Sequence, residues 1–457
     1  MGVLPRLARF QGSRISHQRL KAWVAPPCAL LPLLVVSLVS SLGLAPPSRA
    51  QELAPLGAPA MASLPPAPPP IGLPLLAQQV SCPALQQRVL AAVGAEAPVW
   101  SITVADPQGH LLADLNGQRP RIPASNQKLI STAFALDQLG PDYRLATQLW
   151  RLPSGSYRLI GQGDPDLALP QLQRFAKLAL GSGGGGGELP SLVTLELAEE
   201  PSQAWWPQAW GLDDRTTAYG APITRLAVTS NAINAAVMNP PQRLQSLLQK
   251  TLAQQGGTKV QLRLVSSRDP LPSAAVLLHE ESSAPMHNLL SLANTESHNF
   301  TAEVLLRQGA GTWDLAEARQ REMRWLAQQG LPMQGVNVAD GSGLGRDNRV
   351  TSRLLASLLL RMSQHPYGRN YVASMAIAGQ RGTLRHLFMG TPLQGHFYGK
   401  TGTITGVRAI SGVLDTVDGL RFISAISNGA GAPNDTIGQV LMATLNVGLC
   451  DSARQLP

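Results

Sequence analysis

The segment 123–131, PASNQKLIS, places Ser125 three residues before Lys128. On a helix this spacing puts both side chains on one face, a turn apart. A serine hydroxyl becomes a good nucleophile when a neighbouring group accepts its proton, and a lysine can do so when a desolvated site lowers its pKa. The pair therefore predicts nucleophilic catalysis. The alternative is a solvated lysine, since one such spacing is expected by chance in a chain of this length.

Lysine usage favours the catalytic interpretation. The chain has 31 arginines and only six lysines. Because a guanidinium keeps its proton under working conditions, a lysine is the residue to expect where a proton must be exchanged. Lys400 lies in the segment 399–403, GKTGT, within a predicted strand. The flanking glycines allow a ligand or another backbone to approach closely, although a solvated lysine at a strand end is again the alternative.

A third segment, Ser297-His298-Asn299, completes a recognisable set. Each segment alone says little. In the chain order S-x-x-K, S-x-N, K-T-G, they form the motif set of penicillin-binding proteins and class A β-lactamases. The first motif also lies at a predicted helix start and the third on a predicted strand, as in those proteins.

Further segments narrow the resemblance. From about Val99 to Gly448 the chain resembles a class C low-molecular-mass penicillin-binding protein, of the D-alanyl-D-alanine carboxypeptidase/endopeptidase family. The segments that carry this likeness, and that β-lactamases do not share, are Gly163-Asp164-Pro165, Tyr219-Gly220-Ala221-Pro222, Glu303, the run from Asp340 to Thr351, and Arg381-Gly382-Thr383-Leu384. The insertion between the first two motifs is short here, so a further inserted domain of larger members is expected to be missing.

The resemblance implies an α/β (α+β) fold: a serine β-lactamase/penicillin-binding transpeptidase-like domain with an antiparallel five-stranded sheet, flanking helices, a helical lobe and an inserted second domain. It also implies that Ser125 is the nucleophile and that Lys128 is its base. Lys400 would supply a positive field and, with Thr401 and Gly402, bind the terminal carboxylate of the substrate.

The remaining roles follow from the same resemblance. Ser297 would pass a proton to the leaving amine, and Asn299 would hold the substrate amide and orient Lys128. Backbone N–H groups of Ser125 and Thr403 would form the oxyanion hole. His298, at the variable middle position, is expected to be packed or solvent-facing rather than catalytic. Asp340 and Arg346 either rim the cleft or belong to a structural loop.

The implied function is a serine-type D-Ala-D-Ala carboxypeptidase, DD-endopeptidase or both, acting on peptidoglycan stem peptides and cross-links, with β-lactam antibiotics as covalent inhibitors. The alternatives are a β-lactamase on the same scaffold and a non-catalytic protein that binds the cell wall. No HExxH and no Cys/His cluster at ligand spacing occurs, so we expect no metal, and we expect no cofactor. The absence of a GxSxG segment argues against an α/β-hydrolase.

The formal charge of +9 is concentrated at the N-terminus. Without residues 1–50 the chain has 31 basic and 28 acidic residues, which gives no case for nucleic-acid binding. Those 50 residues combine basic residues, an apolar run from Ala29 to Ala45 and small residues at Ser48 and Ala50. They predict a signal peptide cleaved after Ala50 and a periplasmic protein. A retained anchor with peripheral membrane contact is the alternative.

Composition divides the rest of the chain. Residues 51–78 are rich in Pro and Ala and predict an extended linker. We expect the catalytic domain at 79–146 and 271–457 and the inserted domain at 147–270. Trp205, Trp206 and Trp210 are expected in the core of the insertion, with glycan or peptide contact as the alternative.

Periodicity predicts the elements of the catalytic domain. We expect helices at 82–94, 123–140, 284–310, 356–362 and 435–448, and strands at 99–106, 110–116, 394–404, 407–416 and 420–428. One sheet built from both ends of this domain would bring Cys82 and Cys450 together, and this even pair predicts a disulfide in an oxidising compartment. Two separate thiols are the alternative.

Overall fold

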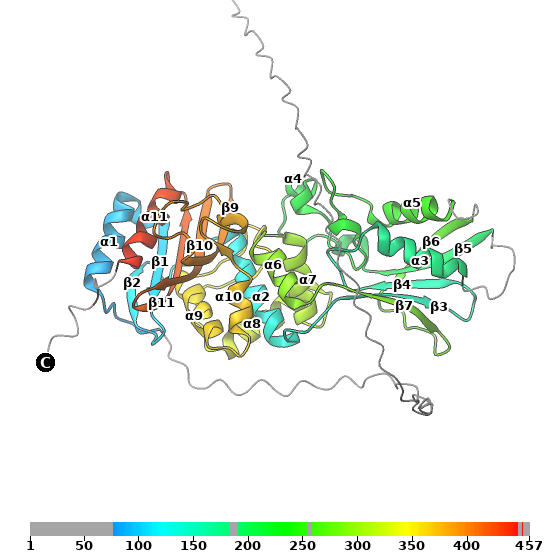
Figure 1. Ribbon diagram of the computed structural model, residues 1–457, viewed down its shortest axis with the longest axis horizontal. Coiled ribbons are helices and arrows are strands. Elements are labelled where there is room, and N and C mark those ends of the chain that lie inside the picture. The colour runs from blue at the N-terminus through cyan, green and yellow to red at the C-terminus, as the bar shows by residue number, and fades with distance from the viewer. Residues whose placement is uncertain (1–75, 182–190, 254–257, 447–449, 451–457) are drawn as a thin grey trace, which may run out of the picture. The chain divides into compact units, whose positions relative to one another are not determined.

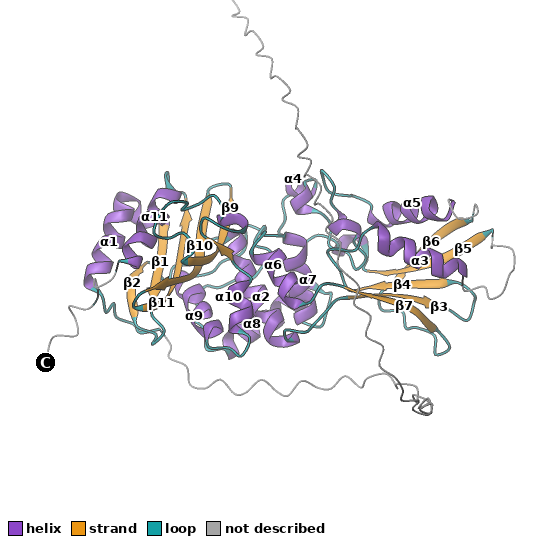
Figure 2. Ribbon diagram, in the orientation of Figure 1, coloured by secondary structure: helices purple, strands orange, loops and turns teal. Residues whose placement is uncertain are grey.

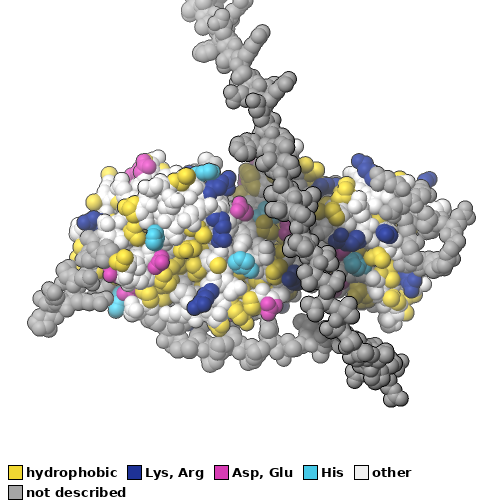
Figure 3. All heavy atoms as spheres, viewed as in Figure 1, with side chains coloured by type: hydrophobic (Ala, Val, Ile, Leu, Met, Phe, Trp, Pro, Cys, Tyr) yellow, Lys and Arg dark blue, Asp and Glu magenta, His cyan; other side chains and the backbone are white. Residues whose placement is uncertain are grey.

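The computed structural model of the chain describes residues 76–181, 191–253, 258–446 and 450. These residues form two β-sheets with associated helices (Figures 1 and 2). The predicted signal peptide and nearly all of the predicted linker lie outside the described residues. Within the described ranges, no helix combines the length and the hydropathy that a membrane span requires. Basic and acidic side chains are interspersed on the face drawn in Figure 3.

The first sheet joins strands from the beginning and the end of the described chain. Its members are β1 (Trp100–Ala105), β2 (Leu111–Leu115), β8 (Ala376–Ile377), β9 (Phe397–Ile404), β10 (Val407–Thr416) and β11 (Gly419–Asn428). The order is β2-β1-β11-β10-β9-β8, and all neighbouring pairs are antiparallel. The expected antiparallel five-stranded sheet is confirmed, with the two-residue strand β8 added at one edge.

Helices cover both faces of this sheet (Figure 1). On one face, α1 (Pro83–Val93) and α11 (Pro433–Leu445) share an apolar core with Trp100, Ile102 and Val104 of β1. The other face meets a helical lobe formed by α2 (Gln127–Leu139), α6 (Met286–Asn294), α7 (Asn299–Gly309), α8 (Leu315–Gln328), α9 (Ser352–Ser363) and α10 (Gly368–Ala373). Because both faces are covered, every residue of β1 is buried.

The predicted helix at 284–310 is divided in the structure. Helix α6 ends at Asn294 and α7 begins at Asn299. Between them Ser297 has a φ of 63°, in the left-handed region that a continuing right-handed helix excludes. The break therefore falls on the S-x-N motif and turns the Ser297 side chain away from the path that an unbroken helix would give it.

The second sheet belongs to the inserted segment and has the order β6-β5-β4-β3-β7. Its strands are β3 (Ala146–Arg151), β4 (Tyr157–Gly161), β5 (Leu192–Glu199), β6 (Lys259–Ser266) and β7 (Val276–Ser282). Strands β4, β5 and β6 run parallel, and α3 (Leu169–Gly181) and α5 (Pro240–Ala253) share its apolar core. Since β7 pairs with β3, the sheet extends past the predicted boundary at residue 270. No local sequence pattern predicts a pairing between strands so far apart in the chain.

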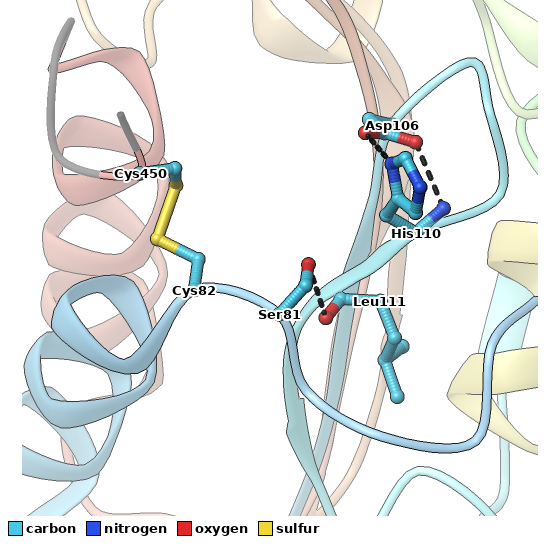
Figure 4. The surroundings of a disulfide bond; sticks show 6 residues. All are labelled: Ser81, Cys82, Asp106, His110, Leu111 and Cys450. Atoms are coloured by element: carbon cyan, nitrogen blue, oxygen red, sulfur yellow. Dashed lines mark hydrogen bonds and ion pairs between the residues drawn. A yellow bond between two sulfur atoms is a disulfide. The ribbon is translucent and has the colours of Figure 1, made fainter. Parts of the chain in front are cut away.

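The two ends of the catalytic domain are joined covalently (Figure 4). Cys82 precedes α1 and forms a disulfide with Cys450, which follows α11; their Cα atoms lie 5.0 Å apart. The hydroxyl of Ser81 donates a hydrogen bond to the carbonyl of Leu111 in β2, so the residue before Cys82 is also attached to the first sheet. The structure therefore contains the disulfide that the sequence predicts between Cys82 and Cys450.

Candidate active site

Ser125 lies in a single helical turn, Ala124–Asn126, that leads directly into α2. The turn is entered through Ala124, whose φ of 47° is left-handed. Ala124 has little room around it, because a Cβ added at Gly343 would lie 1.9 Å from its carbonyl oxygen. The glycine loop after Asp340 thus packs directly on the backbone that carries Ser125, whose side chain remains half-buried.

Lys128 is fully buried, with its Nζ at the centre of three contacts. Nζ donates to Asn299 Oδ1 at 2.6 Å and to the carbonyl oxygen of Ser342 at 2.7 Å, and it lies 3.0 Å from Ser125 Oγ. Burial lowers the pKa of Lys128 to about 7, although the charges of Asp340 and Glu303 oppose the shift. A neutral amine has two hydrogens and one lone pair. The two oxygens that can only accept take the hydrogens, which leaves the lone pair for the Ser125 hydroxyl.

Lys400 is a second buried amine, on β9. Its Nζ donates to Ser297 Oγ at 2.9 Å and to the carbonyl of Thr401 at 2.7 Å. Burial and the charge of Lys128 lower the pKa of Lys400 well below 10.5. The main cause of the lowered pKa of Lys128 is its own burial, rather than the field that the resemblance assigned to Lys400.

The S-x-N motif connects the two amines. Asn299 accepts from Lys128, and its Nδ2 donates to the carbonyl of Tyr219 at 2.9 Å. The ring of His298 instead lies 2.8 Å from Thr301 Oγ1. Burial, together with Lys128, lowers the pKa of His298 to about 4, so this ring is neutral at neutral pH.

Gly402 lets β9 approach the turn that carries Ser125. A Cβ at Gly402 would lie 2.6 Å from the carbonyl oxygen of Pro123 and 3.1 Å from Asn126 Oδ1. Any larger residue would force β9 away from that turn. The neighbouring Thr401 donates to Thr383 Oγ1 at 2.8 Å, and the side chain of Thr403 is exposed.

Behind Lys128, a buried network holds the loop at 341–343. Glu303 Oε1 accepts from the backbone N–H groups of Gly341 and Ser342, both at 2.9 Å, and Oε2 pairs with Arg307 at 2.9 Å. Asp340 is buried and accepts from the N–H of Gly343 at 2.6 Å. Asp340 therefore belongs to a structural loop and not to the rim of the cleft. Ser342, fixed in this way, presents its carbonyl to Lys128.

A pocket of about 340 Å³ opens over Ser125. It is lined by Ser125, Asp214, Tyr219, Ser297, Asn299, Leu344, Arg346, Thr403, Ile404 and Thr405. Ser125, Ser297, Asn299 and Thr403 were predicted site residues, whereas Lys128 and Lys400 lie buried and do not line the pocket.

The inserted segment supplies two pocket residues to which the sequence motifs give no role. Asp214 belongs to no motif, and Tyr219 begins the Tyr-Gly-Ala-Pro segment that carried part of the resemblance. The Tyr219 hydroxyl donates to Asp214 Oδ1 at 3.0 Å. Arg346 also lines the pocket, so the pocket presents one carboxylate and one guanidinium beside the serine.

Among the described residues, no group of three His, Cys, Asp or Glu side chains is arranged to hold a metal ion. The groups that converge near Ser125 are instead amines, hydroxyls and an amide. Such a set can move a proton from the serine and back, and can hydrogen-bond a peptide.

Comparisons with known proteins agree with this arrangement. A D-alanyl-D-alanine carboxypeptidase from Actinomadura sp. is 26% identical over 432 residues, covering 74% of this chain and 79% of that protein. Carboxypeptidase DacB from Mycolicibacterium smegmatis is 26% identical over 390 residues, covering 75% and 79%. In fold, the chain resembles the crystal structure of penicillin binding protein 4 (dacB) from Haemophilus influenzae, with a TM-score of 0.65, 19% identity, and coverage of 79% of this chain and 99% of that one.

The family model of the D-Ala-D-Ala carboxypeptidase 3 (S13) family matches residues 85–242 and 227–446. The match includes all three motifs and both sheets. Together with the convergence of Ser125, Lys128, Ser297 and Lys400 in the fold, it identifies the chain as a member of the D-Ala-D-Ala carboxypeptidase 3 (S13) family.

Proposed function

We propose that the chain is a serine-type D-Ala-D-Ala carboxypeptidase and endopeptidase that cleaves peptidoglycan stem peptides and cross-links through an acyl-enzyme on Ser125. One observation carries this proposal. The Nζ of Lys128 lies 3.0 Å from Ser125 Oγ, has a pKa lowered to about 7, and has its two hydrogens occupied by other acceptors. A general base needs this combination of reach and pKa near the working pH.

In the first step, Ser125 Oγ attacks the carbonyl carbon of the penultimate D-alanine. The hydroxyl proton passes to Lys128 Nζ as the new C–O bond forms. Negative charge develops on the carbonyl oxygen, and the backbone N–H groups of Ser125 and Thr403 would donate to it. Each such donor contributes about 2.7–4 kcal/mol to stabilising the transition state. Gly402 supports this role, because it lets β9 lie against the turn of Ser125.

In the second step, the C–N bond breaks and the amine leaves with a proton. Ser297 is the group placed to deliver this proton, since its hydroxyl lines the pocket and receives a hydrogen bond from Lys400 at 2.9 Å. The proton that Lys128 took from Ser125 is passed on to replace the one that Ser297 gave, so Lys128 is neutral again and can accept a proton from the attacking water molecule. The ester is hydrolysed, the shortened peptide leaves, and Ser125 regains its proton.

Substrate binding would involve groups on both sides of the serine. Lys400 and Thr401 are proposed to attract the terminal carboxylate of the leaving D-alanine, and Asn299 to hold a backbone amide of the stem. Asp214 and Arg346 lie at the same pocket and suit a stem-peptide side chain that carries polar or charged groups. β-Lactams would enter by the same route and remain on Ser125 as an ester.

The pH dependence of acylation follows from the lowered pKa of Lys128. Protonated Lys128 cannot accept the serine proton, so we expect the second-order rate of acylation by penicillin to rise with pH through about 7. An unshifted lysine would place this rise near 10.5. The measurement is the acylation rate between pH 5 and 9. A rate that stays constant over this range would contradict the assignment of Lys128 as the base.

A labelled penicillin and a D-Ala-D-Ala peptide together test the proposal. We expect a long-lived adduct that peptide mapping places on Ser125, and D-alanine release that Ser125→Ala abolishes. Rapid turnover of the penicillin would favour the β-lactamase. A wild-type protein that binds peptidoglycan but releases no D-alanine and cleaves no cross-link would favour a non-catalytic wall-binding protein. Masses of the products from purified peptidoglycan distinguish carboxypeptidase from endopeptidase action.

We further propose that the protein is exported and acts in the periplasm. The basic and apolar N-terminal segment and the disulfide between Cys82 and Cys450 both favour an oxidising compartment. Sequencing the N-terminus of the protein purified from its cell envelope tests this proposal. A mature protein that begins at Gln51 supports it, and a full-length protein recovered from the cytoplasm contradicts it.

A further inference from the structure

A second pocket, larger than the one over Ser125, lies where the inserted segment meets the start of α8. Its volume is about 540 Å³. We call it the tryptophan pocket; its lining residues are Glu200, Pro201, Gln203, Ala204, Trp206, Gln208, Ser266, Arg268, Trp313, Asp314, Leu315, Ala316 and Arg319. None of these residues takes part in the mechanism described above.

Two indole rings are held rigidly in this pocket. Trp206 Nε1 donates to the carbonyl of Gly220 at 2.9 Å, and the Trp206 ring lies 6.3 Å from that of Trp205. The guanidinium of Arg225 lies 4.6 Å from the centre of the Trp313 ring. Both rings are half-buried and line the pocket, so each presents part of its surface there without further ordering. Fixed aromatic surfaces bind with a small entropic cost.

Polar groups with unused hydrogen-bonding capacity surround the rings. Within the described part of the chain, the side-chain amides of Gln203 and Gln208 make no hydrogen bond, and Arg268 makes no ion pair. The buried Nε of Arg319 has no partner. Amides at these positions can donate to and accept from the hydroxyl and acetamido groups of a ligand, and guanidinium groups can donate to them.

The charges of the pocket indicate a neutral ligand. Two acidic residues, Glu200 and Asp314, balance two basic ones, Arg268 and Arg319. Arg225, whose guanidinium lies 2.7 Å from Glu200 Oε1, adds one positive charge beside the pocket, so the excess is a single charge. A site for phosphate-rich ligands would instead show a larger excess of positive charge. A pyranose ring suits this lining, because its C–H face packs on an indole while its hydroxyls and acetamido group meet the polar side chains.

The two pockets share one backbone segment. The carbonyl of Tyr219 accepts from Asn299 in the catalytic pocket, and the carbonyl of the next residue, Gly220, accepts from Trp206 in the tryptophan pocket. Two consecutive peptide groups therefore connect the catalytic asparagine with an indole of the second pocket. The two pockets are therefore neighbours along this segment of the backbone.

We propose that the tryptophan pocket binds the glycan strand of peptidoglycan, a chain of N-acetylated amino sugars, while the stem peptide occupies the pocket over Ser125. This inference rests on the proposed function, and it assigns a second binding site for the polymeric part of the same substrate. It predicts that recognition of intact peptidoglycan and of short peptides depends on different residues.

Binding of chitotetraose, a soluble N-acetylglucosamine oligomer, tests the pocket without any catalysis. The double variant Gln203→Ala/Arg268→Ala removes two exposed side chains that form no ion pair among the described residues, so its fold should be retained. We expect calorimetry to show chitotetraose binding to the wild type and a dissociation constant about tenfold weaker for the double variant. Trp313→Leu should also weaken binding, with its thermal unfolding measured to confirm that it folds. Gln87→Ala/Arg88→Ala on α1 is the matched control, because it removes the same two exposed residue types and should bind like the wild type.

Hydrolysis of two substrates separates the pockets. For the Gln203→Ala/Arg268→Ala variant we expect an increased KM on intact peptidoglycan and an unchanged kcat/KM on a sugar-free D-Ala-D-Ala peptide. Absence of chitotetraose binding to the wild type, or equal binding by both double variants, would overturn the proposal. If the wild type binds chitotetraose through these residues but hydrolyses neither substrate, the pocket assignment stands and the proposed peptidase function fails.

Discussion

Replacing Lys128 with methionine is expected to lower the rate of Ser125 acylation by ~10²–10⁴-fold, the usual contribution of a positioned general base. Methionine fills much of the same volume but cannot accept the proton of Ser125. The Ser125 hydroxyl then loses the amine that lies 3.0 Å from it, and no other amine among the described residues occupies that position. Stopped-flow measurement of penicillin acylation gives the rate directly.

A matched control comes from the exposed lysine at position 177. Lys177→Met removes the same functional group from α3, far along the chain from the motif, and should acylate at the wild-type rate. Circular dichroism and thermal unfolding establish that Lys128→Met remains folded. Acylation of Lys128→Met within a factor of about three of wild type would be incompatible with a base role.

Replacing Glu303 with alanine is expected to cost about 3–5 kcal/mol of unfolding free energy. Glu303 and Arg307 form an ion pair one helical turn apart, with side chains 0% and 1% exposed. Removing the carboxylate leaves the buried guanidinium of Arg307 without its charged partner. It also leaves the N–H groups of Gly341 and Ser342 without their shared acceptor, Glu303 Oε1. The Ser342 carbonyl would lose its fixed position under Lys128, so acylation should slow as well.

The chain supplies a control with the same spacing. Glu317 and Arg321 also pair at i and i+4, but their side chains are 46% and 43% exposed. Glu317→Ala should therefore change the unfolding free energy far less than Glu303→Ala, because solvent screens the exposed pair. Urea denaturation of both variants and the wild type, followed by fluorescence, compares the two pairs. Equal midpoints for Glu303→Ala and Glu317→Ala would contradict the structural role given to the buried pair.

The local part of the site is predictable from sequence because its geometry is that of a helix. Ser125 and Lys128 are three residues apart at a helix start, and this spacing alone brings their side chains together. The contact between Lys400 and Ser297 depends on the packing of β9 against the S-x-N turn, and only the family resemblance indicated it. The left-handed φ of Ser297 was not foreseen, since apolar periodicity continues across the break between α6 and α7.

Residues that reach the site through tertiary packing could hardly be predicted from the sequence. Asp214 comes from the inserted segment and lines the pocket, where it accepts a hydrogen bond from the Tyr219 hydroxyl. Glu303 was noticed only as part of the resemblance, without its role in holding Ser342. Strand β7 was likewise assigned to the catalytic domain by the boundary at residue 270, because its partner β3 lies more than a hundred residues earlier in the chain. Pairings of this kind are decided by the assembled fold rather than by neighbouring residues.

The pairing of β1 with β11 has a consequence for how the protein folds during its synthesis. As the chain is synthesised, β1 emerges early, but the backbone groups along one of its edges have no partner until residues 419–428 follow. Sheets that depend on such distant pairings assemble late and slowly. The first sheet of the catalytic domain therefore cannot be completed until residues 419–428 have been synthesised, and the strands on either side of the active site reach their final arrangement only then.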